Sequence, residues 1–110
     1  MSDKHSDVIS QETARHLPGL FRERVRRSPN NIAYRNYEND QWLDYTWQDM
    51  AAHIDRWQTA LLDEGLVAGD HVAILLRNCP QWVMFEQAAL GIGLIVVPYT
   101  PMIALQIWVI

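Results

Sequence analysis

The chain has 110 residues, enough for at most one domain. Its hydrophobic fraction of 49% is ordinary for a globular protein. The formal net charge of −4 excludes a general electrostatic attraction to nucleic acid or to an anionic membrane. The single cysteine excludes an internal disulfide, which is compatible with a reducing compartment.

The first segment, residues 1–14, is polar, and we expect it to be disordered. It has no apolar stretch of the kind that a secretory signal requires. The longest apolar stretch, residues 88–97, is shorter than the ~20 residues that a membrane-spanning helix needs. The sequence therefore predicts no transmembrane span and a cytoplasmic location, and leaves open a peripheral association with the inner face of the membrane.

A short amphipathic helix is predicted over residues 17–27, because apolar side chains recur there at helical spacing. Its inner stripe consists of Leu17, Leu20, Phe21 and Val25, and its solvent side of Arg22, Glu23, Arg26 and Arg27. The Ser-Pro-Asn-Asn segment at residues 28–31 ends this helix.

A hairpin and a second helix are predicted next. Two strands, residues 32–37 and 41–45, flank Glu38-Asn39-Asp40. Thr46 and Asp49 are close to a capping box, with aspartate where glutamate is usual. The helix then runs to about Glu64, and Gly65 is its natural C-terminal stop. Its apolar stripe is Met50, Ile54, Trp57, Leu61 and Leu62.

Residues 69–98 predict one β-α-β unit. Residues 72–76 are almost purely apolar, as expected for a strand buried on both faces. Asn78 is suited to cap the following helix, and Pro80 to occupy its first turn, because the N–H that proline lacks is not needed there. The helix, residues 81–90, has Trp82, Phe85, Ala89 and Leu90 at helical spacing.

Gly91 and Gly93 end this helix, and residues 94–97 predict a second buried strand that ends at Pro98. Two apolar strands joined by one helix lie parallel, with a right-handed crossover. The order helix, hairpin, helix, strand, helix, strand is the opening of an α/β domain. A doubly wound sheet needs more strands, so we expect an incomplete α/β fold.

Several segments in order carry a family resemblance. They are Ile32-Ala33-Tyr34, Leu43-Asp44-Tyr45-Thr46-Trp47, the run Val67-Ala68-Gly69-Asp70-His71 through Trp82, Gln87 through Gly93, and Val96-Val97-Pro98. Together they resemble the N-terminal region of the AMP-forming acyl-CoA synthetases. These enzymes belong to the adenylate-forming superfamily, with luciferases and peptide-synthetase adenylation domains. The resemblance covers about residues 15–98, and the long-chain fatty-acid branch is the nearest.

The resemblance implies that residues 15–98 are the opening portion of the large N-terminal domain of a long-chain fatty-acid–CoA ligase. Such an enzyme activates a fatty acid with ATP to an acyl-adenylate and transfers the acyl group to CoA. Fatty acid, ATP and CoA are thus the implied partners of the full-length enzyme, with Mg²⁺ and without nucleic acid.

The family holds these molecules with a Ser/Thr/Gly-rich phosphate loop, an acidic motif, a ribose-binding aspartate and a lysine in a C-terminal lid. These motifs do not occur in the 110 residues. We therefore assign no catalytic, cofactor-binding or metal-binding residue, and we expect the chain alone to bind no cofactor and to be inactive.

From Pro101 to Ile110 the sequence is apolar, whereas the family continues with a polar turn and a helix. Residues 102–110 can be back-translated with permitted codons, and the same bases can then be read in a frame that starts one base earlier. That frame gives Asn-Asp-Arg-Pro-Ala-Asn-Met-Gly-Tyr, which resembles what the family carries after this strand. We therefore expect residues 99–110 to be an aberrant tail, produced by a change of reading frame near residues 98–101.

Two alternative functions remain. The first is a small interaction module whose apolar tail docks on a partner or a membrane. The second is a fragment of another adenylate-forming enzyme that acts on aryl or short-chain acids.

Two local features could suggest a site. A phosphate-binding loop follows a strand and precedes a helix, whereas Gly91-Ile92-Gly93 follows a helix and precedes a strand, so we expect a turn.

Cys79 lies near a helix N-terminus, a position that can make a thiol nucleophilic. The sequence places no histidine beside it, so a packed thiol is favoured.

The remaining polar and aromatic candidates favour structural interpretations. His5, His16, His53 and His71 have no metal-ligand spacing, and Asp49 with His53 predicts a surface pair. The basic residues Arg22, Arg24, Arg26 and Arg27 predict a solvated helix face. The tryptophans Trp42, Trp47, Trp57 and Trp82 predict core or hairpin anchors rather than a platform for stacking bases.

Overall fold

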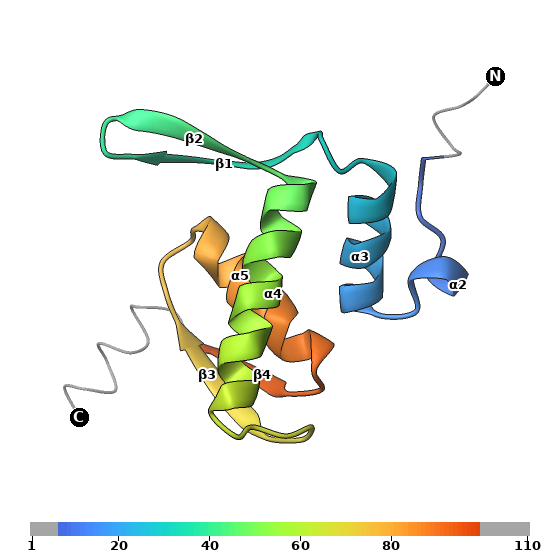
Figure 1. Ribbon diagram of the computed structural model, residues 1–110, viewed down its shortest axis with the longest axis vertical. Helices are drawn as coiled ribbons and strands as arrows, with labels where there is room; N and C mark the ends of the chain where they lie inside the picture. The colour runs from blue at the N-terminus through green and yellow to red at the C-terminus, as the bar shows by residue number, and fades with distance from the viewer. Residues whose placement is uncertain (1–6, 100–110) are drawn as a thin grey trace.

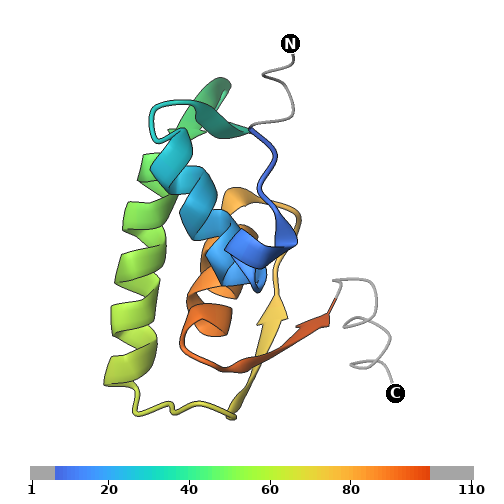
Figure 2. The same ribbon diagram turned by 90° about the vertical axis from the view of Figure 1, so that its right-hand side faces the viewer.

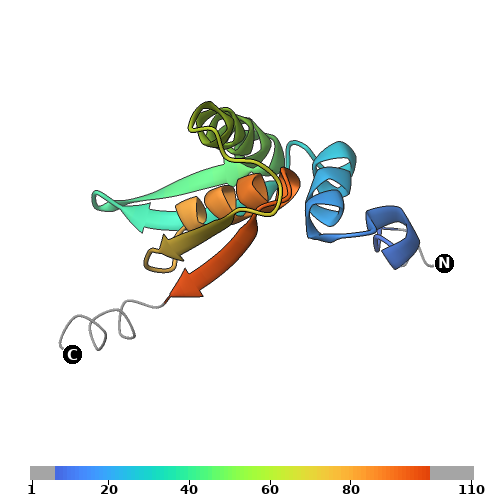
Figure 3. The ribbon, with the colours of Figure 1, turned by 90° about the horizontal axis from the view of Figure 1, so that it is seen from below.

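The computed structural model describes residues 7–99. Its elements, in chain order, are α2 (Gln11–Ala14), α3 (Leu17–Arg27), β1 (Ile32–Glu38), β2 (Gln41–Thr46), α4 (Trp47–Asp63), β3 (His71–Leu75), α5 (Pro80–Gly91) and β4 (Ile95–Tyr99). The β1–β2 hairpin extends away from the helices (Figure 1). Helix α5 packs against α3, α4 and both strands β3 and β4, so it lies at the centre of the fold (Figures 2 and 3).

The first described residues differ from the expectation of disorder. Within residues 7–14 the chain forms the one-turn helix α2, and the Ser10 hydroxyl accepts a hydrogen bond from the Thr13 amide at 3.2 Å. A side-chain cap satisfies one of the amides that a helix start leaves without a partner. The polar composition indicated disorder but did not account for this local bond.

Helix α3 has the predicted bounds, but its predicted inner stripe is partly wrong. Leu17 and Leu20 are exposed, whereas Phe21 packs against the core. The helix contacts both α4 and α5, but these contacts leave part of its apolar stripe exposed.

The predicted hairpin is confirmed, with a shorter turn. Glu38 pairs with Gln41 at the end of the ladder, so the loop is Asn39-Asp40. Both loop residues have positive φ angles, +53° and +63°. A two-residue turn with two positive φ angles matches the right-handed twist of the strands, and asparagine and aspartate tolerate this region.

The capping box of α4 is also confirmed. The Asp49 amide donates to the Thr46 hydroxyl and the Thr46 amide donates to the Asp49 carboxylate, both at 3.0 Å. Of the predicted stripe, Met50, Ile54 and Leu61 are buried and Trp57 packs against them. Leu62, however, is exposed. Gly65, with a φ angle of +84°, follows the end of the helix as predicted.

Strands β3 and β4 are parallel, as predicted, and their register runs from the pair His71–Ile95 to the pair Leu75–Tyr99. Two details of the prediction are wrong. Cys79, not Asn78, is the N-cap of α5, and Pro98 lies within β4 instead of ending it. Each strand of a two-stranded sheet has a free edge, so a proline there is tolerated.

The core lies where α4, α5 and the inner face of the β3–β4 sheet meet. Its buried members are Met50, Ile54, Leu61, Met84, Ala88, Ala89 and Leu94. Ile74, on the inner face, is 3% exposed, whereas Leu75, on the outer face, is 47% exposed. The prediction that β3 is buried on both faces is therefore wrong for residues 7–99, because the helices cover one side of the sheet.

The described helices include none that could cross a membrane. Within residues 7–99, no helix combines the length and the apolar character that crossing a bilayer requires.

Candidate functional site

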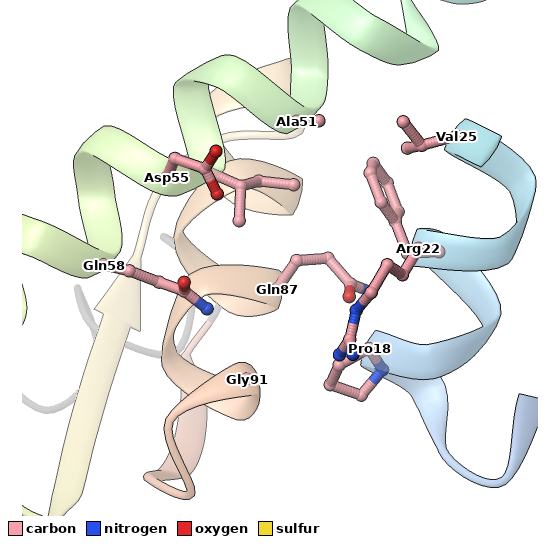
Figure 4. Close-up of a pocket in the computed structure, with 10 residues that line it drawn as sticks. Pro18, Arg22, Val25, Ala51, Asp55, Gln58, Gln87 and Gly91 are labelled. Carbon is pink, nitrogen blue, oxygen red and sulfur yellow. The ribbon is translucent and has the colours of Figure 1, made fainter. Parts of the chain in front are cut away.

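A cavity of about 350 Å³ lies between α3, α4 and α5 (Figure 4). Its walls combine apolar and polar side chains from all three helices: Pro18, Phe21, Arg22, Val25, Ala51, Ile54, Asp55, Gln58, Gln87 and Gly91. Figure 4 shows the Gln87 side chain extending from α5 toward α3. Because three helices contribute to this cavity, we consider it first as a candidate site.

The two glutamines of this cavity differ in their hydrogen bonding. Gln58 donates from Nε2 to the backbone oxygen of Ala88 at 3.2 Å, which links α4 to α5. The Oε1 atom of Gln87 is buried and has no hydrogen-bond partner among residues 7–99. A buried acceptor of this kind calls for a donor such as water. Neither amide is a nucleophile or a general base.

The sequence did not single out Gln58 or Gln87. A signal was present for Gln87, because it is a polar residue in a mostly apolar helix, between Met84 and Ala88. Its meaning depended on how α3 packs on α5, which the sequence alone does not give.

A second, more open hollow of about 650 Å³ lies between the N-terminal segment and α3. Leu17, Leu20, Phe21, Tyr34 and Trp47 form its apolar part. At its rim the Arg24 guanidinium donates to the Asp7 carboxylate at 2.9 Å. The pair neutralises both charges, so the hollow offers no unpaired charge at this point for an ionic ligand.

Cys79 and the glycines occupy structural positions. Cys79 is half-buried at the start of α5, and its side chain makes no capping hydrogen bond there. Gly91 is the last residue of α5, and Gly93, with a φ angle of +83°, forms the turn into β4. A Cβ atom on Gly93 would lie 3.0 Å from the Ala68 Cβ atom, so both the angle and the space favour glycine.

The three described histidines belong to different elements. His16 caps α3, accepting a hydrogen bond from the Gly19 amide at Nδ1, 2.9 Å away. His53 on α4 lies 2.8 Å from an Arg56 nitrogen and contacts the Tyr45 ring, and His71 starts β3. His5 lies outside the described residues. Across residues 7–99, no group of three or more His, Cys, Asp or Glu side chains is placed to hold a metal ion.

The predicted pair of Asp49 and His53 is not a direct contact in this structure, because each has another partner. Asp49 belongs to the capping box, and the amide and hydroxyl of Thr46 lower the pKa of its carboxyl group, with a small contribution from His53. His53 contacts Arg56 and Tyr45.

Three arginines of α3, namely Arg24, Arg26 and Arg27, form ion pairs with carboxylates. Arg26 Nε lies 3.1 Å and Arg27 Nε 2.9 Å from Glu23 oxygens, so two guanidinium groups converge on one carboxylate. Their hydrogen bonds, that from Arg26 first, lower the pKa of Glu23 from 4.5 to about 2. This face of α3 is thus locally neutralised and is not a strongly basic surface.

The tryptophans are spread over the fold. Trp47 lies edge-on to Phe21 and Tyr34, and Trp57 lies edge-on to Phe85, with ring centres 5.6 Å apart in the second pair. Trp42 contacts Tyr37 on the hairpin and is exposed. Each of these tryptophans packs in a separate aromatic contact, so together they form no continuous surface on which bases could stack.

The described residues do not fit the ATP, Mg²⁺ and CoA that the resemblance implies. Across residues 7–99 no group of three or more His, Cys, Asp or Glu side chains is placed to hold Mg²⁺. No reaction step is therefore assigned to residues 7–99.

Comparison with known proteins gives a consistent family match. The family model described as "AMP-binding enzyme" matches residues 21–106. This match extends past residue 98, where the sequence resemblance was expected to end, into the segment that lies outside the described residues.

Two curated relatives share this region. The chain is 36% identical over 90 residues to the nonribosomal peptide synthetase sidE of Aspergillus fumigatus, covering 82% of the chain and 4% of that protein. It is 30% identical over 83 residues to the long-chain-fatty-acid–CoA ligase FadD15 of Mycobacterium tuberculosis, covering 76% of the chain and 14% of the ligase. The chain thus spans less than a sixth of the length of either relative.

Two solved structures share the fold. A Mycobacterium tuberculosis fatty acyl CoA synthetase superposes with a TM-score of 0.67 at 28% identity, covering 74% of this chain and 16% of that one. Klebsiella oxytoca NpsA in complex with 3-hydroxyanthranilyl-AMSN gives a TM-score of 0.67 at 26% identity, covering 76% and 16%. The described α/β fragment corresponds to the N-terminal portion of such adenylate-forming enzymes. With a family match over most of its length, the chain belongs to the AMP-binding enzyme family.

Proposed function

We propose that the chain is the opening part of the large domain of an AMP-forming long-chain fatty-acid–CoA ligase. The observation that carries the proposal is the ordered similarity to FadD15 over 83 residues, together with the fold shared with a fatty acyl CoA synthetase. ATP, Mg²⁺ and CoA would act on the complete enzyme, in the cytoplasm or at the inner membrane face.

In this proposal the chain supplies support rather than chemistry. Helix α5 joins α4 to the first two parallel strands through a core centred on Met50 and Met84. Ligands of open parallel sheets bind outside the carboxyl ends of the strands. In β3 and β4 these ends are Leu75 and Tyr99, which lie side by side in the register.

A graft tests this supporting role. The segment of FadD15 that matches this chain is replaced by residues 21–99, and formation of palmitoyl-CoA is measured. We expect a folded chimera whose rate stays within about tenfold of the parent, because the grafted segment carries none of the family's catalytic motifs. A matched graft carrying Met84→Asp should lose both folding and activity, because Met84 is 2% exposed. A well-folded chimera without the Asp substitution that makes no acyl-adenylate would contradict the proposal.

A second candidate is the adenylation unit of a peptide synthetase, which is favoured by the 36% identity to sidE over 90 residues. The same graft in an adenylation unit of sidE separates the two candidates. Recovery of amino-acid-dependent pyrophosphate exchange in that host, with failure in the ligase host, would favour the second.

The purified 110-residue chain provides a further check. We expect no fatty-acid-dependent exchange of pyrophosphate with ATP, because the described residues hold no metal or phosphate group. Exchange above the background without fatty acid would overturn this expectation.

A further inference from the structure

Helix α2 is joined to α3 by a strained turn at Arg15. The φ and ψ angles of this residue are +69° and −46°, and the His16 amide donates to the Ala14 carbonyl at 2.7 Å. This is a three-residue γ-turn of the rare form with positive φ. A residue other than glycine is strained in this conformation, so its surroundings must hold it there. Figure 1 shows the result, with α2 beside the start of α3.

The start of α3 provides what holds the turn. His16 is the N-cap of this helix, and its Nδ1 atom accepts a hydrogen bond from the Gly19 amide at 2.9 Å. Gly19 also leaves the space that the turn requires, because a Cβ atom there would collide with the backbone oxygen of Ala14. One residue, His16, thus bonds to α2 through its backbone and to α3 through its ring, so its orientation links the two helices.

The ring of His16 can make this bond only while it is neutral. A ring nitrogen that accepts a hydrogen bond carries no proton, so the proton of the neutral ring is on Nε2. Histidine side chains gain a second proton between about pH 8 and pH 5, and both ring nitrogens are then donors. A protonated Nδ1 would face the donating amide of Gly19 at a helix start, where the partial charge is also positive. The cap would therefore be lost.

The charged groups on the neighbouring elements do not favour a protonated ring at this place. Arg15 precedes His16 in the chain, and Arg22 of α3 lines the same hollow of about 430 Å³ beside the start of this helix. From α5 this hollow is lined by residues 90–91, a leucine and a glycine, which carry no charge. Helix α2 contributes one carboxylate, that of Glu12. Two cations and one carboxylate give no net attraction for a third positive charge.

We propose that His16 is a pH-sensitive latch, which holds α2 against α3 when its ring is neutral and releases α2 when its ring is protonated. On release, the backbone at Arg15 relaxes to an ordinary negative φ, and this change swings α2 away from α3. Arg24 still holds Asp7 through its 2.9 Å ion pair, so the motion is confined to residues 8–15. The inference does not rest on the substrate or reaction of the proposed function.

Nuclear magnetic resonance of the ¹⁵N-labelled 110-residue chain tests the latch. At about pH 7.5 we expect the ring proton of His16 on Nε2. Between about pH 7.5 and pH 5.5, protection of the Gly19 amide from hydrogen exchange, corrected for the intrinsic rate, should fall about fivefold. Heteronuclear Overhauser effects should fall over the same range for residues 11–14 and stay constant for residues 22–26. A proton on Nδ1 at the higher pH, or unchanged Gly19 protection, would overturn the proposal.

Two variants assign the effect to His16. In His16→Asn the amide oxygen caps the helix and does not titrate, so Gly19 protection should stay within about twofold between the two pH values. The matched control is His53→Gln with His71→Gln, which removes the histidines of α4 and β3 and should keep the fivefold loss. A loss in His16→Asn equal to that of the parent, or no loss in the control, would contradict the latch. The measurements on the unsubstituted chain decide the question if a variant does not fold.

Discussion

Thr46 connects the hairpin to the longest helix. It is the last residue of β2 and also the N-cap of α4, where its hydroxyl accepts the Asp49 amide at 3.0 Å. Each of these features depends on residues that are close in sequence. For that reason the capping box was predictable before any tertiary structure was known.

Replacing Thr46 with alanine should therefore destabilise the protein by about 1 kcal/mol, since one helix amide loses its partner. Urea unfolding followed by far-ultraviolet circular dichroism measures the change. Thr59→Ala is the matched control, because its hydroxyl donates to the Asp55 carbonyl in mid-helix and caps no amide. If both variants lost the same stability, the capping box would not be the cause.

Glu23 gives the stability a pH dependence. Arg26 and Arg27 lower its pKa from 4.5 to about 2 in the folded chain. Because the folded value lies below the unfolded one, the stabilisation is fully present above about pH 4.5 and is lost as the pH falls toward 2.

We expect the urea midpoint of Glu23→Gln to fall less steeply than that of the parent protein between pH 4.5 and 2. We expect a small effect, because the ion pairs of Glu23 with Arg26 and Arg27 lie near the surface. Glu12→Gln, on α2, is the control and should keep the slope of the parent. Parallel pH profiles for Glu23→Gln and the parent would show that these ion pairs do not contribute.

At the level of elements, the contact between α4 and α5 determines stability. Met50 and Met84 are the two largest fully buried side chains, and Trp57 meets Phe85 beside them. Met84→Ala should cost about 2–5 kcal/mol, because it removes buried atoms and leaves a cavity. Leu62→Ala, at an exposed position on α4, should cost less than about 0.5 kcal/mol. Chemical unfolding of the two variants checks the difference, and similar losses would place the core elsewhere.

The bounds of most elements could be predicted because they depend on local chemistry. The Asn39-Asp40 turn and the Gly65 stop are examples, since each is encoded by a residue that tolerates positive φ. The burial of apolar stripes could not be predicted in the same way. Leu17, Leu20 and Leu62 continue their stripes in sequence, but which part of a stripe is covered depends on how the helices pack.

At the scale of the whole molecule, the same distinction explains the sheet and the candidate site. The apolar runs of β3 and β4 predicted strands with two buried faces, whereas β3 has one buried residue, Ile74, and β4 has none. The cavity around Gln87 arises where three helices meet, so no short motif indicated it. Membership of the family could be inferred from the sequence more easily than the burial of the sheet or the position of the cavity, because it requires only that matching segments occur in the right order.

The reading frame beyond residue 98 is the remaining question at this scale. The apolar composition of residues 101–110 suggested a change of frame, and these residues lie outside the described part of the chain. The alternative is an unshifted frame, in which residues 101–110 continue the domain as they stand in the sequence. Single-molecule sequencing of the gene and its transcript across codons 95–110 and several hundred bases beyond separates these alternatives. We expect a one-base difference near codons 98–101, followed by a Ser/Thr/Gly-rich loop with lysine, because the chain is apolar where the family that it resembles has a polar turn and a helix. A gene and a transcript that keep the given frame through codon 110, with no such loop in any frame beyond it, would contradict a change of frame.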